Sequence, residues 1–97
     1  MYTSIRRYTT SPDDVAAIME IVKQGDIRDR IGGIPGFVAY YMVDCGDGVV
    51  ATVSVFNDRA GADQSNAVAA EWVKEHVLPN YSLSSPEISA GEVVLSV

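Results

Sequence analysis

The stretch that decides the fold is FVAYYMVDCGDGVVATVSVF, residues 37–56. Its two arms, 37–44 and 49–56, are rich in valine, tyrosine and phenylalanine, residues that favour β-strands. Between the arms, CGDG supplies two glycines, which readily adopt the positive φ angles of a tight turn. We therefore predict a β-hairpin over these twenty residues.

The segments on either side of the hairpin predict alternating strands and helices. YTSIRRYT (2–9) is typical of a strand, and SPDD (11–14) predicts the beginning of a helix, because Ser11 can cap it and Pro12 suits its first turn. The expected elements after that are one helix interrupted at Gly25, a short helical piece ended by GGIPG (32–36), a helix over about 60–78, and a last strand within 87–97 with a bulge at Gly91. The order βαββαβ predicts one α+β domain over residues 1–97, in which two helices cover one face of a four-stranded antiparallel sheet.

Composition and charge narrow the classes of partner. The formal net charge of −6 argues against nucleic acid, because binding phosphates requires clustered lysine and arginine. No apolar run approaches the roughly 18 residues that a membrane span needs, and the opening MYTSIRRY lacks the apolar core of a signal peptide. The single cysteine, Cys45, agrees with a reducing compartment. We therefore expect a cytoplasmic protein without a membrane or nucleic-acid partner.

Both faces of the predicted hairpin are apolar. Strict alternation across a two- or four-residue loop puts Val49, Ala51, Val53 and Val55 with Val38, Tyr40 and Met42, and puts Phe37, Ala39, Tyr41 and Val43 with Val50, Thr52, Ser54 and Phe56. An antiparallel sheet covered by helices on one side normally has a polar second side. A second copy of the chain is the simplest cover for an apolar second face, so we predict a homodimer in which two sheets face each other.

The second of these groups also resembles the lining of a small-ligand site. Aromatic walls with a few hydroxyls are typical of such sites. The candidate ligand-binding residues on this face are Phe37, Tyr41, Thr52, Ser54 and Phe56. A closed, packed interface is the alternative interpretation of the same residues.

EWVKEH (71–76) holds the only tryptophan and the only histidine of the chain, one helical turn apart. The core stripe of this helix is predicted to be Ala62, Ala69, Val73 and Val77, with Trp72 and His76 at its border. In one interpretation Trp72 packs at the edge of the core or lines a ligand site, and His76 interacts with the helix dipole. In the other, His76 is a general base or an axial ligand. A zinc site is not expected, because the chain has no second histidine.

Arg6 and Arg7 point to opposite faces of the first strand, so we expect one to form an ion pair and the other to meet an anionic ligand. The chain has no G-x-S-x-G, P-loop, G-x-G-x-x-G or H-E-x-x-H motif. The sequence therefore gives no support to hydrolase, nucleotide-binding or zinc-protease functions.

The stretch IPGFVAYYMVDCGDGVVATVSVFNDRAGADQSN (34–66) resembles the antibiotic biosynthesis monooxygenase (ABM) superfamily of dimeric α/β barrels. The matching features are PGF at the opening of the second strand, the hairpin, and the aromatic and acidic residues where the third strand leads into a helix. The resemblance implies a ferredoxin-like fold that assembles as a dimer. The superfamily includes cofactor-independent quinone-forming monooxygenases, haem-degrading enzymes and proteins of no assigned activity.

As a member of such a family, the chain is expected to bind a small aromatic or hydrophobic molecule in a sheet-lined cavity. Cofactor-independent oxygenation is the implied chemistry, and the candidates for orientation and proton transfer are Tyr41, Arg7 and His76. A non-catalytic binding or structural homodimer is the alternative. A haem-binding protein with His76 as ligand is a third possibility, although the first strand lacks the asparagine that the haem-degrading branch carries.

Overall fold

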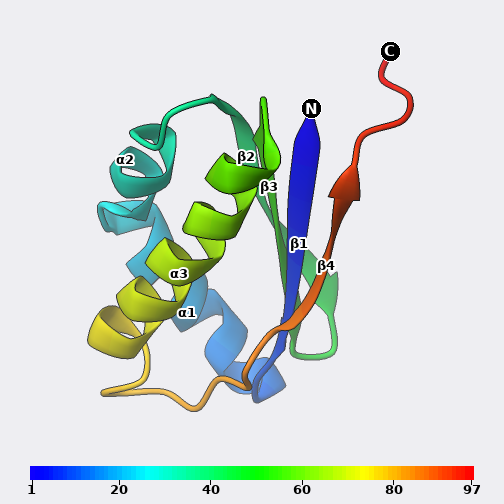
Figure 1. The fold of residues 1–97 in the computed structure, drawn as a ribbon. Coiled ribbons are helices and arrows are strands. Elements are labelled where there is room, and N and C mark those ends of the chain that lie inside the picture. The colour runs from blue at the N-terminus through cyan, green and yellow to red at the C-terminus, as the bar shows by residue number, and fades with distance from the viewer.

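The computed structural model describes all residues from Met1 to Val97. The strands are β1 (Tyr2–Thr9), β2 (Phe37–Gly46), β3 (Val49–Phe56) and β4 (Glu87–Glu92), and the helices are α1 (Val15–Gln24), α2 (Ile27–Gly32) and α3 (Arg59–His76). A 3₁₀ turn at Pro12–Asp14 leads into α1. The strands form one antiparallel sheet in the order β2-β3-β1-β4, and the helices lie on one of its faces (Figure 1). The predicted ferredoxin-like α+β fold is confirmed.

Helix α3 begins after a residue whose side chain accepts a hydrogen bond from a free backbone N–H of the first turn. The Asp58 carboxylate accepts a hydrogen bond from the Gly61 backbone N–H at 3.0 Å, which is the geometry of an N-cap. Gly61 also lets the helix approach the end of β3, since a Cβ there would lie 2.6 Å from the Phe56 ring. The helix ends at His76, two residues before the predicted end.

The end of the chain differs from the prediction. Strand β4 stops at Glu92, and the Val93 N–H makes the last bond of this ladder, to the Met1 carbonyl at 2.9 Å. Residues 94–97 are exposed and project from the body (Figure 1). The predicted bulge at Gly91 is wrong, because Gly91 pairs with Thr3 in regular register.

The hairpin is where predicted, but its faces are not. Asp47 and Gly48 form the turn with positive φ angles of 54° and 81°, and Gly46 pairs with Val49. A bulge at Cys45 then adds one residue to β2, so that Met42 lies opposite Thr52 and Tyr40 opposite Ser54. A one-residue slip moves every following side chain to the other face. The predicted grouping of Thr52, Ser54 and Phe56 with Tyr41 is therefore wrong.

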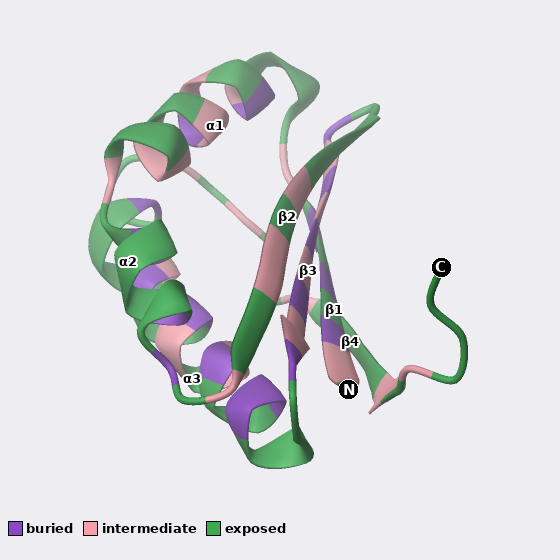
Figure 2. Cartoon of the chain, turned by 90° about the horizontal axis from the view of Figure 1, so that it is seen from above, coloured by how far each residue is buried: buried purple, intermediate pink, exposed green.

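The core lies between the sheet and the three helices. Trp72 is its largest fully buried side chain, with 1% of its surface exposed. The buried hydrophobic cluster consists of Ile18, Ile27, Ile31, Ile34, Phe56, Ala62, Trp72 and Val77. No second layer covers the far side of the sheet (Figure 2). None of the helices is both long and apolar enough to cross a membrane.

Candidate functional site

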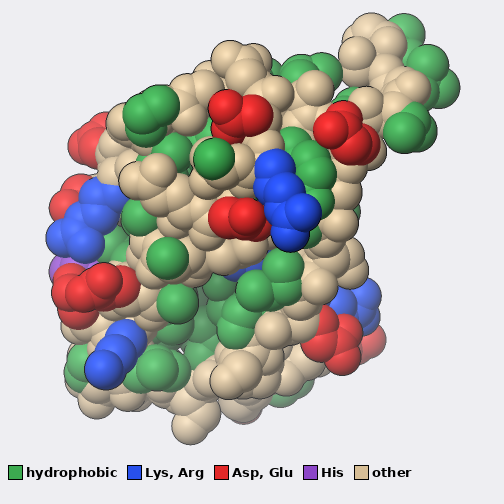
Figure 3. Space-filling view, viewed as in Figure 1, with side chains coloured by type: hydrophobic (Ala, Val, Ile, Leu, Met, Phe, Trp, Pro, Cys, Tyr) green, Lys and Arg blue, Asp and Glu red, His purple; other side chains and the backbone are tan.

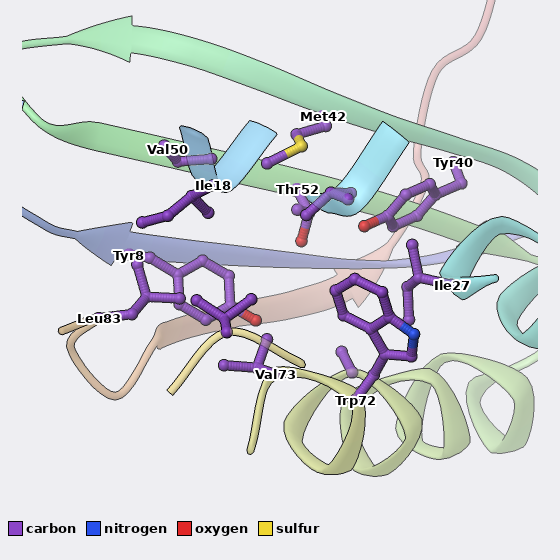
Figure 4. A pocket seen from close by; sticks show the side chains of 13 residues that line it. Tyr8, Ile18, Ile27, Tyr40, Met42, Val50, Thr52, Trp72, Val73 and Leu83 are labelled. Carbon is purple, nitrogen blue, oxygen red and sulfur yellow. The ribbon is translucent and has the colours of Figure 1, made fainter. Parts of the chain in front are cut away.

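A small cavity lies between the helix-facing side of the sheet and the helices. It has a volume of about 40 Å³, and Thr52 is its one lining residue outside the hydrophobic and aromatic class. Its walls come from β1, β2, β3, α1, α2, α3 and the loop before β4 (Figure 4). The lining residues are Tyr8, Ile18, Val22, Ile27, Tyr40, Met42, Val50, Thr52, Ala69, Trp72, Val73, Val77 and Leu83. An apolar cavity with few polar groups is typical of a small-molecule site.

Three hydroxyl groups point into this cavity, from Tyr8, Tyr40 and Thr52 (Figure 4). The Thr52 hydroxyl is buried and has no hydrogen-bond partner. Burial raises the pKa of Tyr8 and of Tyr40 above the ordinary value of 10.0, and the nearby Arg6 charge opposes that rise in both. Both phenols are therefore protonated at neutral pH and can donate a hydrogen bond to a ligand oxygen.

Arg6 is buried beside these hydroxyls, with 1% of its surface exposed. Its Nη1 donates to Ser65 Oγ at 3.2 Å and Asn66 Oδ1 at 2.8 Å, and its Nη2 donates to Ser54 Oγ at 2.9 Å. All of these acceptors are uncharged.

Arg6 has no carboxylate partner, and its Nε has no hydrogen-bond acceptor. A buried charge is costly unless an opposite charge accompanies it. The cavity therefore borders an uncompensated positive charge.

The prediction that one of the two adjacent arginines forms an ion pair is wrong. Neither Arg6 nor Arg7 has a carboxylate within 4.0 Å. Strand alternation puts Arg6 on the cavity side and Arg7 on the open side of the sheet. The guanidinium on the cavity side of the sheet is therefore that of Arg6.

Trp72 forms a wall of the cavity, and its indole is contacted by two residues that do not line the cavity, Asp26 and His76. Its indole Nε1 donates to Asp26 Oδ1 at 2.8 Å, and this hydrogen bond is the main cause that lowers the pKa of Asp26. The His76 ring stacks on the indole at a centroid distance of 4.6 Å, tilted by 31°. The predicted placement of Trp72 at the border of the core is wrong, because Gly25 leaves room for the indole to enter it.

The structure brings together only some of the predicted site residues. Thr52 and Trp72 line the cavity, and Ser54 and Phe56 are buried on the same side of the sheet. Phe37 packs edge-on against Phe56 at 5.9 Å, at the end of the hairpin.

The three predicted catalytic residues lie apart from the cavity. Tyr41, 60% exposed, and Arg7 lie on the open face of the sheet. His76 is exposed at the end of α3, with Nε2 3.7 Å from Glu75 Oε2. These three residues therefore do not lie together in one site.

Tyr8 and Tyr40 are site residues that the sequence did not predict, whereas Arg6 was one of the two arginines expected to meet an anionic ligand. Arg6 and Tyr8 alternate along β1 with Ile5 and Arg7, and the buried set of that strand is Ser4, Arg6 and Tyr8. An alternating polar set of this kind, ending in an aromatic residue, was the available signal. Tyr40 could be found only by placing the bulge at Cys45.

The sequence matches no protein-family model and no curated protein sequence. The fold is similar to that of a putative antibiotic biosynthesis monooxygenase from Nitrosomonas europaea (TM-score 0.73, 12% identity, covering 98% of this chain and 100% of that one). It is also similar to SnoaB, a cofactor-independent oxygenase from Streptomyces nogalater (TM-score 0.67, 17% identity, 99% and 95% covered). A third similar structure is a dimeric ferredoxin-like protein from an uncultured marine organism (TM-score 0.68, 14% identity, 99% and 96% covered). The chain therefore shares the ferredoxin-like α+β fold of these three structures.

Proposed function

We propose that this ABM-like protein binds a small aromatic molecule as its phenolate anion in the cavity between sheet and helices, and promotes its cofactor-independent oxygenation. The observation that carries the proposal is the buried guanidinium of Arg6, which has no counter-ion. The similarity in fold to SnoaB, a cofactor-independent oxygenase, supports the choice of chemistry.

The polar groups of the cavity suit a ligand oxygen that carries negative charge. Arg6 would stabilise that charge, while the protonated Tyr8 and Tyr40 and the unpartnered Thr52 hydroxyl would donate hydrogen bonds to it. The apolar remainder of the lining would pack against the aromatic ring. Binding would therefore favour the deprotonated ligand over the neutral one.

A bound phenolate is an electron-rich carbon nucleophile that can react with O₂ directly. In the overall reaction, a phenol and O₂ give a quinone and water. One oxygen atom becomes the new quinone carbonyl, and the other leaves in water with the phenolic proton and the displaced ring proton. The ligand supplies the electrons and O₂ is the oxidant, so the balance needs no further reductant. The protein would stabilise the anion and position it, the two roles that its cavity residues suit.

The free volume of about 40 Å³ is small for an aromatic ring. Ligand entry must therefore displace part of the wall, and Met42 is the most adaptable lining side chain because its thioether stem is unbranched. The chemical roles then fall to Arg6, buried on the cavity side of the sheet, and to the hydroxyls of the cavity, whereas Tyr41, Arg7 and His76 do not line the cavity.

Binding of para-nitrophenol tests the proposal, because the colour of this phenol reports its ionisation. We expect the protein to lower the apparent pKa of bound para-nitrophenol and to bind it at least about tenfold more tightly than para-nitroanisole, which cannot ionise. Absorbance titrations at several pH values measure both quantities. Equal affinity for the two compounds would contradict anion binding. Dissolved-oxygen uptake with α-naphthol tests the oxygenation separately, and binding without uptake would leave a non-catalytic binding protein.

The open face of the sheet supports a homodimer. Its apolar residues are Ile5, Ala39, Tyr41, Val43, Ala51, Val53 and Val55. The C-terminal tail, residues 94–97, also projects from the body and exposes Val94, Leu95 and Val97 (Figure 3). A contiguous uncovered patch of this kind is characteristic of an interaction surface. We propose that a second copy covers this face, sheet against sheet, as the fold of the similar dimeric ferredoxin-like protein supports.

Val53→Asp, near the middle of the open face, is expected to convert the dimer to monomer. Two-fold symmetry would bury two new carboxylates, so dimerisation should weaken about 100-fold or more. Size-exclusion chromatography with light scattering measures the mass of each variant. Ala67→Asp, an exposed change on α3, is the matched control and should leave a dimer. A monomeric unmodified protein at micromolar concentration would refute the assembly.

A further inference from the structure

A groove adjoins the cavity between α1 and the edge strand β2. It has a volume of about 210 Å³ and shares Val22, Tyr40 and Met42 with the cavity. Its other lining residues are Met19, Lys23 and Arg28. Because β2 is an outer strand of the sheet, no further strand closes the groove on that side. The groove is therefore an open approach to the cavity.

Two of the few cationic side chains of the protein flank this groove. The chain has seven lysine and arginine residues and a formal net charge of −6, so two cations at one opening concentrate positive charge against the overall sign. The Arg28 Nη2 donates to the Lys23 carbonyl at 3.1 Å, which fixes the guanidinium at the end of α1.

The charge of Arg28 is not neutralised within the chain, because no carboxylate lies within 4.0 Å of it. Lys23 has only a long contact with Glu20, at 3.7 Å, and both of those side chains are largely exposed. Such a surface contact contributes little. Arg28 is therefore available to an anionic ligand group.

We infer that this groove is the mouth of the cavity and that Arg28, assisted by Lys23, binds a carboxylate at the end of the ligand remote from its phenol. This inference rests on the proposed function and names its substrate class: an aromatic phenol that carries a carboxylate side chain. The ring lies in the cavity, the linking carbons pass the apolar side chains that cavity and groove share, and the carboxylate meets Arg28 at the surface. Arginine suits this role because its planar fork binds both oxygens of a carboxylate.

A second groove adjoins the cavity on the other side and fixes the direction of the ligand. It has a volume of about 150 Å³ and shares Tyr8, Val73 and Leu83 with the cavity. Its remaining residues are Ala70, Leu78, Ser84, Ser85 and Pro86, and none carries a charge. Of the two openings, only the α1–β2 mouth therefore offers a cationic partner to a carboxylate.

The test compares para-hydroxyphenylpropanoate with its methyl ester, which keeps the ring and phenol but lacks the charge. We expect the unmodified protein to bind the acid about fivefold more tightly than the ester, as for a single well-placed surface ion pair. In Arg28→Gln this preference should disappear, because the acid weakens while the ester does not. Isothermal titration calorimetry measures the four dissociation constants.

Arg59→Gln is the matched control, because it removes one exposed positive charge from the start of α3 without touching the groove. It should keep the preference for the acid. An ester bound as tightly as the acid by the unmodified protein, or a preference that Arg59→Gln removes as fully as Arg28→Gln, would overturn the inference while leaving the proposed function in place. Failure of both compounds to bind would overturn the two together. High salt should weaken binding of the acid towards that of the ester and leave the affinity for the ester unchanged.

Discussion

Arg6→Met is expected to weaken binding of para-nitrophenol about 100-fold. The same change should lower the free energy of unfolding by at most about 1 kcal/mol. The loss of affinity corresponds to about 3 kcal/mol, which is the upper range for a hydrogen bond to a charged group. Methionine is unbranched and uncharged, and although it is shorter than arginine it fills much of the space of the aliphatic stem. The combination matters, because a purely structural arginine would lose stability when replaced.

The stability expectation follows from the surroundings of Arg6. A buried cation without a counter-ion pays the cost of desolvation and receives only neutral hydrogen bonds in return. Two of its acceptors keep other partners in the variant. Ser65 Oγ donates to the Ala62 carbonyl at 2.6 Å, and Asn66 Oδ1 accepts from Ser4 Oγ at 2.7 Å. Urea unfolding measures the free energy of unfolding of both proteins.

Arg7→Met is the discriminating comparison, because it removes the same charge from the next residue on the opposite face. We expect it to leave para-nitrophenol binding unchanged. Loss of binding in Arg7→Met with binding retained in Arg6→Met would assign the ligand to the open face and reject the cavity. A large loss in the free energy of unfolding of Arg6→Met would instead show that Arg6 has a structural role.

The contrast between Arg6 and Arg7 shows how far sequence reasoning carries. The strands and helices follow from strand-forming residues, helical periodicity and the glycines of the turn, and these are local properties. The side of the sheet on which a residue lies depends on register, and one bulged residue, Cys45, reverses it for β2 against β3. The predicted grouping of Thr52 and Ser54 with Tyr41 is therefore wrong, although the hairpin itself is correctly predicted.

The position of Trp72 was missed for a different reason. Its burial requires space that another element must leave open, and the sequence of α3 carries no information about that space. The space is provided at Gly25, between α1 and α2, where a Cβ would lie 2.3 Å from the Trp72 Cζ2 atom. Gly25 has a φ of −83°, which any residue can adopt, so the requirement for glycine there is packing and not backbone strain. Only the assembled fold shows that the two residues depend on each other.

Gly25→Ala is expected to destabilise the protein by about 1–3 kcal/mol, the cost of forcing an extra group into a packed core. Trp72→Leu should cost about 2–4 kcal/mol, because it leaves a void and removes the hydrogen bond to Asp26. The double variant should cost clearly less than the sum, because leucine vacates the space that the new methyl group needs. Urea unfolding of the four proteins at neutral pH measures this coupling.

Neutral pH is the correct condition because the Trp72 hydrogen bond lowers the pKa of Asp26 in the folded state. The stabilisation linked to that shift is complete above the ordinary Asp pKa of 3.8 and is lost as the pH falls through the lowered value. The Trp72→Leu cost should therefore be largest at neutral pH and shrink in acid, whereas the Gly25→Ala cost should not follow that titration. Strict additivity of the two changes at neutral pH would mean that the indole does not occupy the space beside Gly25. In that case Trp72 would no longer define the cavity wall on which the binding proposal depends.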